Sequence, residues 1–189
     1  MILSVETDSI SLDARLLVVG LRTPADVKLW KLWDFPDEKA MLAAFVEHFL
    51  SVQGDKIIIG YNLLKFDVPL LLHKAAAAGL PLFSEFFSRI NSSNVIDLFT
   101  ILTFLNEGQL KGMDFYCERF GVPALGPKRD EVAVLWKSGT KESLERIATL
   151  VSLKLNTIND LFLKSWGRVR DGSFKPWERQ PSQPMGGSA

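Results

Sequence analysis

The order of segments in this sequence predicts an α/β domain built on a mixed sheet. Three short apolar segments come first, and a further apolar strand follows them between two amphipathic helices. The connections among the first three segments are too short for parallel crossovers, so these strands should form an antiparallel meander. The later strand reaches the first one through a helix, and this connection predicts a parallel pairing.

Apolar runs and alternation identify the individual strands. Residues 1–5 and 14–21 are mostly apolar, and residues 27–33 alternate apolar and polar side chains, which is the period of a half-buried strand. Residues 56–60 form a buried strand. Residues 94–98 form a short strand or a strand-to-helix turn. The strands therefore lie in the first hundred residues of the chain.

Amphipathic helices account for most of the remaining chain. The helix after the meander opens at residues 36–38, carries one apolar stripe, and should end at Gly54 and Asp55. A second helix spans residues 69–78 and stops at Gly79. The other predicted helices cover residues 99–105, 111–120, 130–136 and 141–163.

Composition divides the chain into a globular domain, residues 1–165, and a tail rich in proline and glycine, residues 166–189. The tail interleaves aromatic and basic side chains, namely Trp166, Arg168, Arg170, Phe174, Lys175, Trp177 and Arg179. Such a segment suits stacking on bases or docking into a groove of a partner. It also suits a flexible end, or one that folds back over an apolar patch. The sequence does not choose among these alternatives.

Charge and cysteine content exclude several classes of protein. The 189 residues include 22 basic and 22 acidic side chains, which disfavours a strongly basic nucleic-acid binder but leaves room for a local basic patch. The single cysteine, Cys117, excludes a disulfide and a cysteine-based zinc site within the chain. We therefore expect a reducing, cytoplasmic location. We expect neither a membrane span nor a signal peptide, since no apolar run approaches about 20 residues and the N-terminus lacks a basic region.

Residues 60–71 carry the most specific pattern in the chain. They read Gly-Tyr-Asn-Leu-Leu-Lys-Phe-Asp-Val-Pro-Leu-Leu, between a predicted strand and a predicted helix. This stretch resembles the second exonuclease motif of the proofreading domain of family B DNA polymerases, within the DnaQ-like, DEDD-type 3′–5′ exonucleases. The resemblance implies a ribonuclease H-like fold, with a mixed sheet of about five strands and helices on both sides. On the residues alone, the stretch is also compatible with a turn and a helix capped by Asp67.

The resemblance assigns roles to residues of this motif. Asp67 holds the place of an aspartate that points into the active site and binds metal. Asn62 would line the substrate groove and Phe66 would anchor the start of the helix, so we expect Tyr61, Asn62 and Phe66 to bind nucleic acid. The weaker part of the resemblance extends over about residues 1–163.

Two of the four metal-binding positions that the resemblance implies lack a carboxylate. The first motif, Asp-x-Glu-Thr, falls at residues 4–7, where Glu6 is present but Ser4 replaces the aspartate. The third motif places Lys154 at the aspartate position, and a register slip of one residue places Leu153 there. Neither residue is a carboxylate, and the tyrosine or histidine base expected four or five residues earlier is missing.

These replacements conflict with two-metal chemistry, because holding a pair of divalent ions needs several carboxylates. Glu6 and Asp67 are the expected ligands if any metal binds. The helical period places Lys154 toward the body of the domain, so we expect its amine to contact Glu6 or Asp67 as a fixed cation. The alternative is that it extends to water. Asp97 is either a substitute ligand or a capping aspartate at the strand-to-helix turn.

We therefore expect a catalytically degenerate 3′–5′ exonuclease-like domain with no catalytic residue and no cofactor. It would act as a binding or structural component of a nucleic-acid-processing assembly, with nucleic acid, or a protein of a replication or repair complex, as its partner. One alternative is an active exonuclease with an unconventional site that uses Mg²⁺ or Mn²⁺. A second alternative is a protein-interaction module without nucleic-acid contact.

Overall fold

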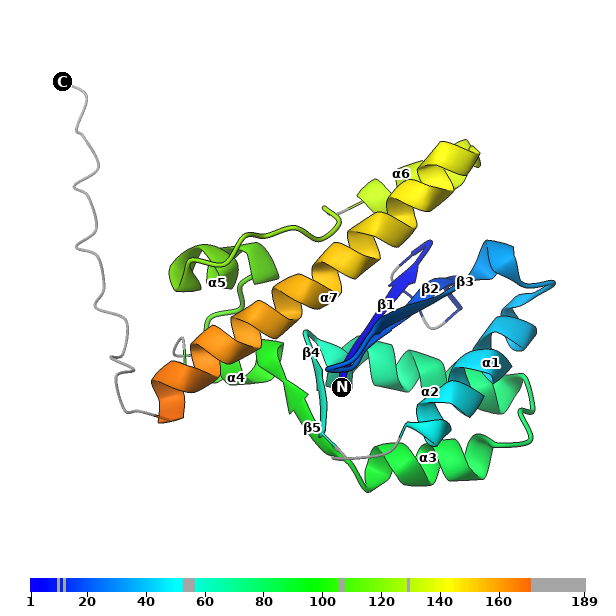
Figure 1. The fold of residues 1–189 in the computed structure, drawn as a ribbon, viewed down its shortest axis with the longest axis horizontal. Coiled ribbons are helices and arrows are strands. Elements are labelled where there is room, and N and C mark those ends of the chain that lie inside the picture. The colour runs from blue at the N-terminus through cyan, green and yellow to red at the C-terminus, as the bar shows by residue number, and fades with distance from the viewer. Residues whose placement is uncertain (10, 12, 53–56, 106–107, 129, 171–189) are drawn as a thin grey trace.

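A central five-stranded sheet organises the computed structural model, which describes residues 1–170 except 10, 12, 53–56, 106–107 and 129. Helices cover both faces of this sheet (Figure 1). In spatial order the strands are β3-β2-β1-β4-β5. Their bounds are β1 Ile2–Thr7, β2 Leu16–Arg22, β3 Val27–Lys31, β4 Ile57–Gly60 and β5 Asn94–Asp97.

The pairing of the strands confirms the predicted mixed sheet. β1, β2 and β3 form an antiparallel meander, whereas β4 pairs with both β1 and β5 in parallel. Helix α1 (Glu38–Ser51) connects β3 to β4 and begins where the side chain of Asp37 accepts a hydrogen bond from the backbone N–H of Ala40, at 2.7 Å. The predicted end of this helix at Gly54 and Asp55 lies outside the described residues.

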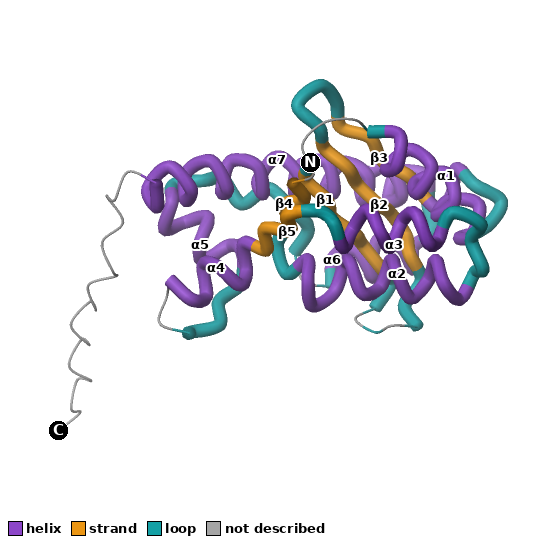
Figure 2. The backbone as a smooth tube through the Cα atoms, turned by 90° about the horizontal axis from the view of Figure 1, so that it is seen from below, coloured by secondary structure: helices purple, strands orange, loops and turns teal. Residues whose placement is uncertain are grey.

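Two layers of helices enclose the sheet. The first layer packs on one face and consists of α1 (Glu38–Ser51), α2 (Val68–Ala77) and α3 (Phe83–Asn91). The second layer covers the other face and consists of α4 (Leu98–Leu105), α5 (Met113–Phe120), α6 (Glu131–Ser138) and α7 (Lys141–Arg170). Figure 2 shows α4 and α5 beyond the β5 edge of the sheet, beside the C-terminal half of α7. In the part of the chain that the structure describes, none of the helices combines the length and the apolar character of a membrane span.

Alternation along β1 decides which of its side chains face α7. Leu3 and Val5 pack into the core with α1 and α2, while Ile2 packs into the core with α7. Successive side chains of a strand point to opposite faces, so Ser4 and Glu6 also face α7. The two β1 residues of the predicted site therefore lie under the helix that carries Lys154.

Gly20 on β2 allows α7 to lie close to the sheet. It pairs with Ser4, and a Cβ atom at Gly20 would lie 2.9 Å from Leu155 Cδ1 and 3.0 Å from Val151 Cγ1. Contacts of this length are shorter than packed side chains tolerate. The absence of a side chain at Gly20 therefore sets the distance between the sheet and the turn of α7 that holds Lys154.

One of the α-helices in the described residues, α3, was not predicted from the sequence. α3 spans Phe83–Asn91, and its residues Phe86 and Ile90 are buried against α1 and α2. Aromatic residues at helical spacing were the available signal, but the segment is short and lies between a turn and a strand. Its helical state depends on the apolar face that α1 and α2 offer, because isolated helices of this length are unstable.

The boundary between domain and tail is also corrected. α7 continues to Arg170, so residues 166–170 belong to the helix and not to the predicted tail. The ring of Trp166 stacks on that of Phe162 one turn earlier, with ring centroids 5.8 Å apart. Aromatic pairs at this spacing stabilise a helix, which explains why α7 passes the predicted end. The remaining tail, residues 171–189, lies outside the described residues.

We expect Gly20→Ala to destabilise the protein by about 1–3 kcal/mol, because the new methyl group would push against Leu155 and Val151. Gly167→Ala in α7 is the matched control, since a Cβ atom there meets no neighbour within 4 Å. The control should stabilise the fold by about 0.5–1 kcal/mol, as alanine favours a helix over glycine. Urea denaturation measures both changes, and equal effects of the two substitutions would contradict the close approach of α7.

Candidate functional site

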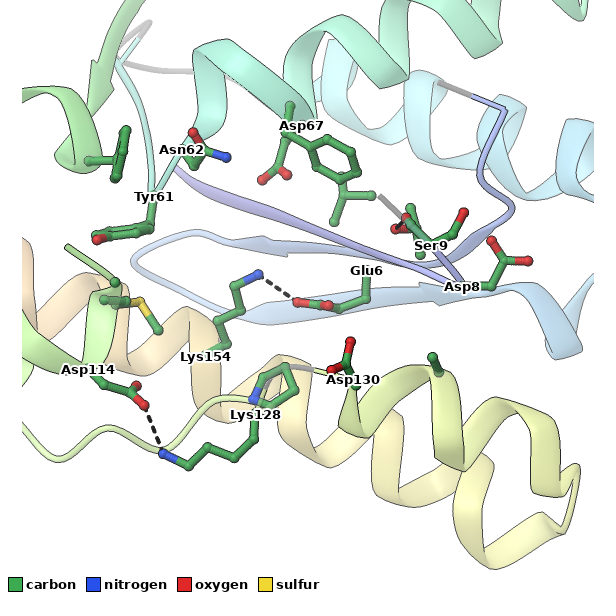
Figure 3. A pocket seen from close by; sticks show the side chains of 18 of the residues that line it. Glu6, Asp8, Ser9, Tyr61, Asn62, Asp67, Asp114, Lys128, Asp130 and Lys154 are labelled. Atoms are coloured by element: carbon green, nitrogen blue, oxygen red, sulfur yellow. Dashed lines mark hydrogen bonds and ion pairs between the residues drawn. The ribbon is translucent and has the colours of Figure 1, made fainter. Parts of the chain in front are cut away.

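A cleft of about 560 Å³ opens at the carboxyl end of β1. It is lined by residues from the end of β1, the turn after β4, the segments before α5 and α6, and the middle of α7. Figure 3 shows Glu6, Asp67 and Lys154 in its centre. The structure thus brings together three of the four predicted metal-binding positions. The fourth, Ser4, is buried next to them on the same face of β1.

Lys154 and Glu6 form an ion pair at the centre of the cleft. The Lys154 amine donates a hydrogen bond to Glu6 Oε1 at 2.6 Å, so the predicted contact is present. Both side chains are mostly buried, with exposed fractions of 19% for Lys154 and 14% for Glu6. Burial alone would lower the pKa of Lys154, but the carboxyl groups of Glu6 and Asp67 together raise it. Lys154 therefore stays positively charged at neutral pH.

The surroundings of Lys154 hold its side chain in place. Gly126, in the segment before α6, lies against the aliphatic stem of Lys154, and a Cβ atom at Gly126 would be 3.2 Å from Lys154 Cβ. The alternative in which the amine extends into water is therefore wrong, because the stem is covered and the amine is paired inside the cleft. The hydroxyl of Ser4 is buried and makes no hydrogen bond within the described residues.

Asp67 faces this ion pair from the other side of the cleft (Figure 3). It ends the π-helical turn Leu63–Asp67 and has a helical backbone, and its side chain makes no capping bond to α2. The alternative in which Asp67 caps the helix is therefore wrong. Burial raises the pKa of Asp67 to about 8, and the charge of Lys154 only partly offsets this effect. At neutral pH Asp67 is therefore mainly protonated.

Asp97, at the end of β5, organises the turn that carries the motif. Its carboxylate accepts hydrogen bonds from the backbone N–H groups of Asn62 at 2.9 Å, Leu64 at 2.9 Å and Phe99 at 3.0 Å. Asn62 has a left-handed backbone with φ of 63°, which costs energy outside glycine and needs such support. Of the two alternatives for Asp97, the structure therefore favours the structural one.

The three residues expected to bind nucleic acid, Tyr61, Asn62 and Phe66, all line the cleft. The Tyr61 hydroxyl donates to the backbone carbonyl of Lys111 at 2.8 Å, and its ring packs edge-on against Phe99. Burial, together with neighbouring acidic groups, raises the pKa of Tyr61, so it remains a neutral phenol. Tyr61 is therefore fixed in place as one wall of the cleft.

Further charged residues of the cleft could not be recognised from the sequence. Lys128, before α6, pairs with Asp114 on α5 at 3.0 Å, and Asp130 lies on the rim next to α6. Charged residues in loops and on exposed helix faces are usually only solvated, so the sequence carries no signal that these three meet at the cleft. Among the described residues, no group of three or more His, Cys, Asp or Glu side chains is placed to hold a metal ion.

Comparisons with known proteins agree with this fold. Residues 18–109 match the family model described as the exonuclease domain of family B DNA polymerases. This segment includes the motif at residues 60–71, whereas Ser4, Glu6 and Lys154 lie outside it. No curated protein sequence matches the chain.

Among solved structures, the family B DNA polymerase from the hyperthermophilic archaeon Pyrobaculum calidifontis matches with a TM-score of 0.71 and 19% sequence identity. The match covers 87% of this chain and 24% of the polymerase, so the chain spans about a quarter of that protein's length. The resemblance and the ribonuclease H-like fold predicted from the sequence are thereby confirmed. The chain matches the exonuclease-domain model over residues 18–109, and it shares its fold with a quarter of the polymerase over most of its length.

The raised pKa of Asp67 predicts a pH dependence of stability. The folded state keeps the Asp67 proton up to about pH 8, whereas the unfolded chain loses it near pH 4. The free energy of unfolding should therefore fall as the pH rises from about 4 to about 8 and level off above. Asp67→Asn removes this contribution. Between about pH 5 and about pH 8.5, the free energy of unfolding of the wild type should therefore fall by at least about 1 kcal/mol more than that of the variant.

Urea unfolding at both pH values measures this difference. Asp130→Asn, on the exposed rim of the same cleft, is the control and should follow the wild type. Parallel profiles for wild type and Asp67→Asn would show that Asp67 ionises in the folded protein as it does in water.

Proposed function

We propose that this chain is a non-catalytic, exonuclease-like domain that binds a nucleic-acid strand within a nucleic-acid-processing assembly. We further propose that Lys154 serves as a fixed cation where related enzymes bind metal. The ion pair between Lys154 and Glu6 carries this proposal, because an ammonium group occupies the position at which a divalent ion would need an oxygen ligand. The domain would work in a reducing, cytoplasmic setting, with a replication or repair protein as the other partner.

The donor groups of the cleft do not fit a pair of divalent ions. Two-metal catalysis needs two ions about 4 Å apart, held by several carboxylates. One oxygen of Glu6 is hydrogen-bonded to Lys154 at 2.6 Å, and the charge of Lys154 also acts on Asp67, so this ammonium group would repel a cation held by the two carboxyl groups. Ser4 contributes a hydroxyl in place of a third carboxylate. The cleft therefore does not suit two-metal catalysis.

Without metals, the cleft retains groups that suit a strand end. An ammonium group has three N–H donors, and Glu6 takes one of those of Lys154. Lys111 and Lys128 line the cleft together with Asp8, Asp114 and Asp130, and Lys128 is paired with Asp114. Tyr61, Phe66 and Asn62 offer two aromatic rings and an amide. Phosphate pairing with lysines and stacking of bases on rings are the two interactions by which proteins hold single strands. The proposed binding is therefore independent of divalent ions.

The first test is a nuclease assay. Purified protein with Mg²⁺ or Mn²⁺ should leave labelled single-stranded DNA and RNA at full length, because the carboxylate set and the base of the related enzymes are incomplete. Removal of nucleotides from the 3′ end that disappears in Asp67→Ala would overturn the proposal. It would establish instead the alternative of an active exonuclease, since the loss would tie digestion to this cleft.

The second test removes the cation. Lys154→Met keeps the apolar stem but leaves Glu6 buried without its positive partner, so the free energy of unfolding should fall by about 3 kcal/mol. Addition of about 10 mM Mg²⁺ should restore part of this loss, because the vacated place then offers oxygen ligands. Urea denaturation with and without Mg²⁺ measures both effects.

Lys128→Met is the matched control for this test. Lys128 also lines the cleft and pairs with a carboxylate, but both partners are more than half exposed. The control should lose less than about 1 kcal/mol and should not respond to Mg²⁺. A wild type that gains as much stability from Mg²⁺ as Lys154→Met would contradict the role of Lys154.

A further inference from the structure

A second hollow, an apolar groove of about 700 Å³, lies at the beginning of β1, whereas the cleft lies at the carboxyl end of this strand. The groove and the cleft share no lining residue. Strands β4 and β5 and the last turns of α7 contribute five large apolar side chains to the groove, namely Ile57, Ile59, Ile96, Phe162 and Trp166. An apolar hollow of this size at the surface is typical of a site that receives another apolar group.

Trp166 forms one wall of this apolar groove. Its side chain is 45% exposed, although it is among the largest apolar side chains of the chain. Its ring stacks on that of Phe162, with centroids 5.8 Å apart, so the two rings present a combined aromatic surface to the groove. Accessible aromatic rings are common anchors of binding sites, because each offers a large rigid area at a small cost in side-chain entropy.

The segment that follows α7 begins beside this groove. α7 ends at Arg170, four residues after Trp166 and therefore about 6 Å farther along the helix axis. Residues 171–189 lie outside the described residues, and their sequence contains two aromatic side chains, Phe174 and Trp177. An extended chain covers at most about 3.5 Å per residue, so Phe174 reaches up to about 14 Å from Arg170 and Trp177 up to about 24 Å. Both rings can therefore return to the level of Trp166.

We propose that residues 174–177 dock into the apolar groove and place the rings of Phe174 and Trp177 against Trp166. Pro176 lies between the two aromatic residues, and proline favours an extended, polyproline-type backbone for itself and for the residue before it. A polyproline helix has three residues per turn, so two rings that are three residues apart lie on the same face. Proline-containing segments bind to grooves with aromatic walls in this way.

Tethering favours this segment over a separate protein as the occupant of the groove. Three residues separate Arg170 from Phe174, and a short linker of this kind gives an effective concentration in the millimolar range. A separate partner would have to bind much more tightly to displace the tail. Because the groove and the cleft have no residue in common, the docking does not depend on the proposed function.

Trypsin cleavage after Arg179 in the full-length protein tests the docking. Trp177 lies two residues before Arg179, so the docked segment withholds this bond from the protease, and the initial cleavage rate reports the fraction of chains with a free tail. A synthetic peptide of residues 171–189 gives the rate for a free tail. The wild type should be cleaved at this bond at least about tenfold more slowly than the peptide, as followed by mass spectrometry of the fragments.

Two variants and a control assign the protection to the groove. Ala25→Glu places a charge on an exposed turn that lines the groove, and should raise the cleavage rate at least about fivefold. Phe174→Ser with Trp177→Ser changes no described residue, and should be cleaved as fast as a peptide of its own sequence. Ala76→Glu, on the exposed side of α2 and outside the groove, is the matched control and should stay within about twofold of the wild type. Thermal melting of each variant checks that the fold is intact.

Three outcomes would overturn the docking. Equal rates for the wild type and the peptide would leave the groove to a separate partner. Protection that increases over about a hundredfold range of protein concentration would assign the tail to the groove of a second copy. Equal acceleration in Ala25→Glu and Ala76→Glu, or full protection in the variant without the two rings, would show that the protection arises elsewhere.

Discussion

The ion pair between Lys154 and Glu6 joins two segments that are 148 residues apart in sequence, the first strand and the last helix. It forms only because Gly20 lets α7 lie close to the sheet and because Glu6 shares a face of β1 with the core under α7. A charged pair so deep in a domain is stable only when each charge has its partner, since removal of one leaves the other buried and uncompensated. The position of α7, the shape of the cleft and the charge at its centre therefore depend on the same contact.

Two buried aspartates near the cleft have different tasks, and their hydrogen bonds explain why. Asp97 accepts three backbone N–H groups and so supports the left-handed turn at Asn62. Asp67 lies 5% exposed opposite an ion pair that is already complete, so burial favours its neutral form. The ion pair between Glu6 and Lys154 is complete in itself and Asp67 beside it is mainly protonated, so the centre of the cleft carries little net charge.

The folded chain gathers cations from distant segments over aromatic rings. Lys65 lies over Phe99, while Lys111 and Arg119 lie over Phe115. The Tyr61 ring packs against Phe99, and the Tyr61 hydroxyl donates to the backbone carbonyl of Lys111. These contacts therefore border the cleft and follow from tertiary packing.

The sequence by itself determined the class of fold, the motif at residues 60–71 and the direction in which Lys154 points. These features are local, because alternation, helical period and the length of connections are written in neighbouring residues. Only the tertiary structure decided that α3 is a helix, that α7 reaches Arg170 and that Lys154 pairs with Glu6 instead of Asp67. It also decided that Asp97 supports the turn at Asn62 and that Asp67 is protonated. Burial and contacts between distant segments set these properties, and neither is encoded in the spacing of residues along the chain.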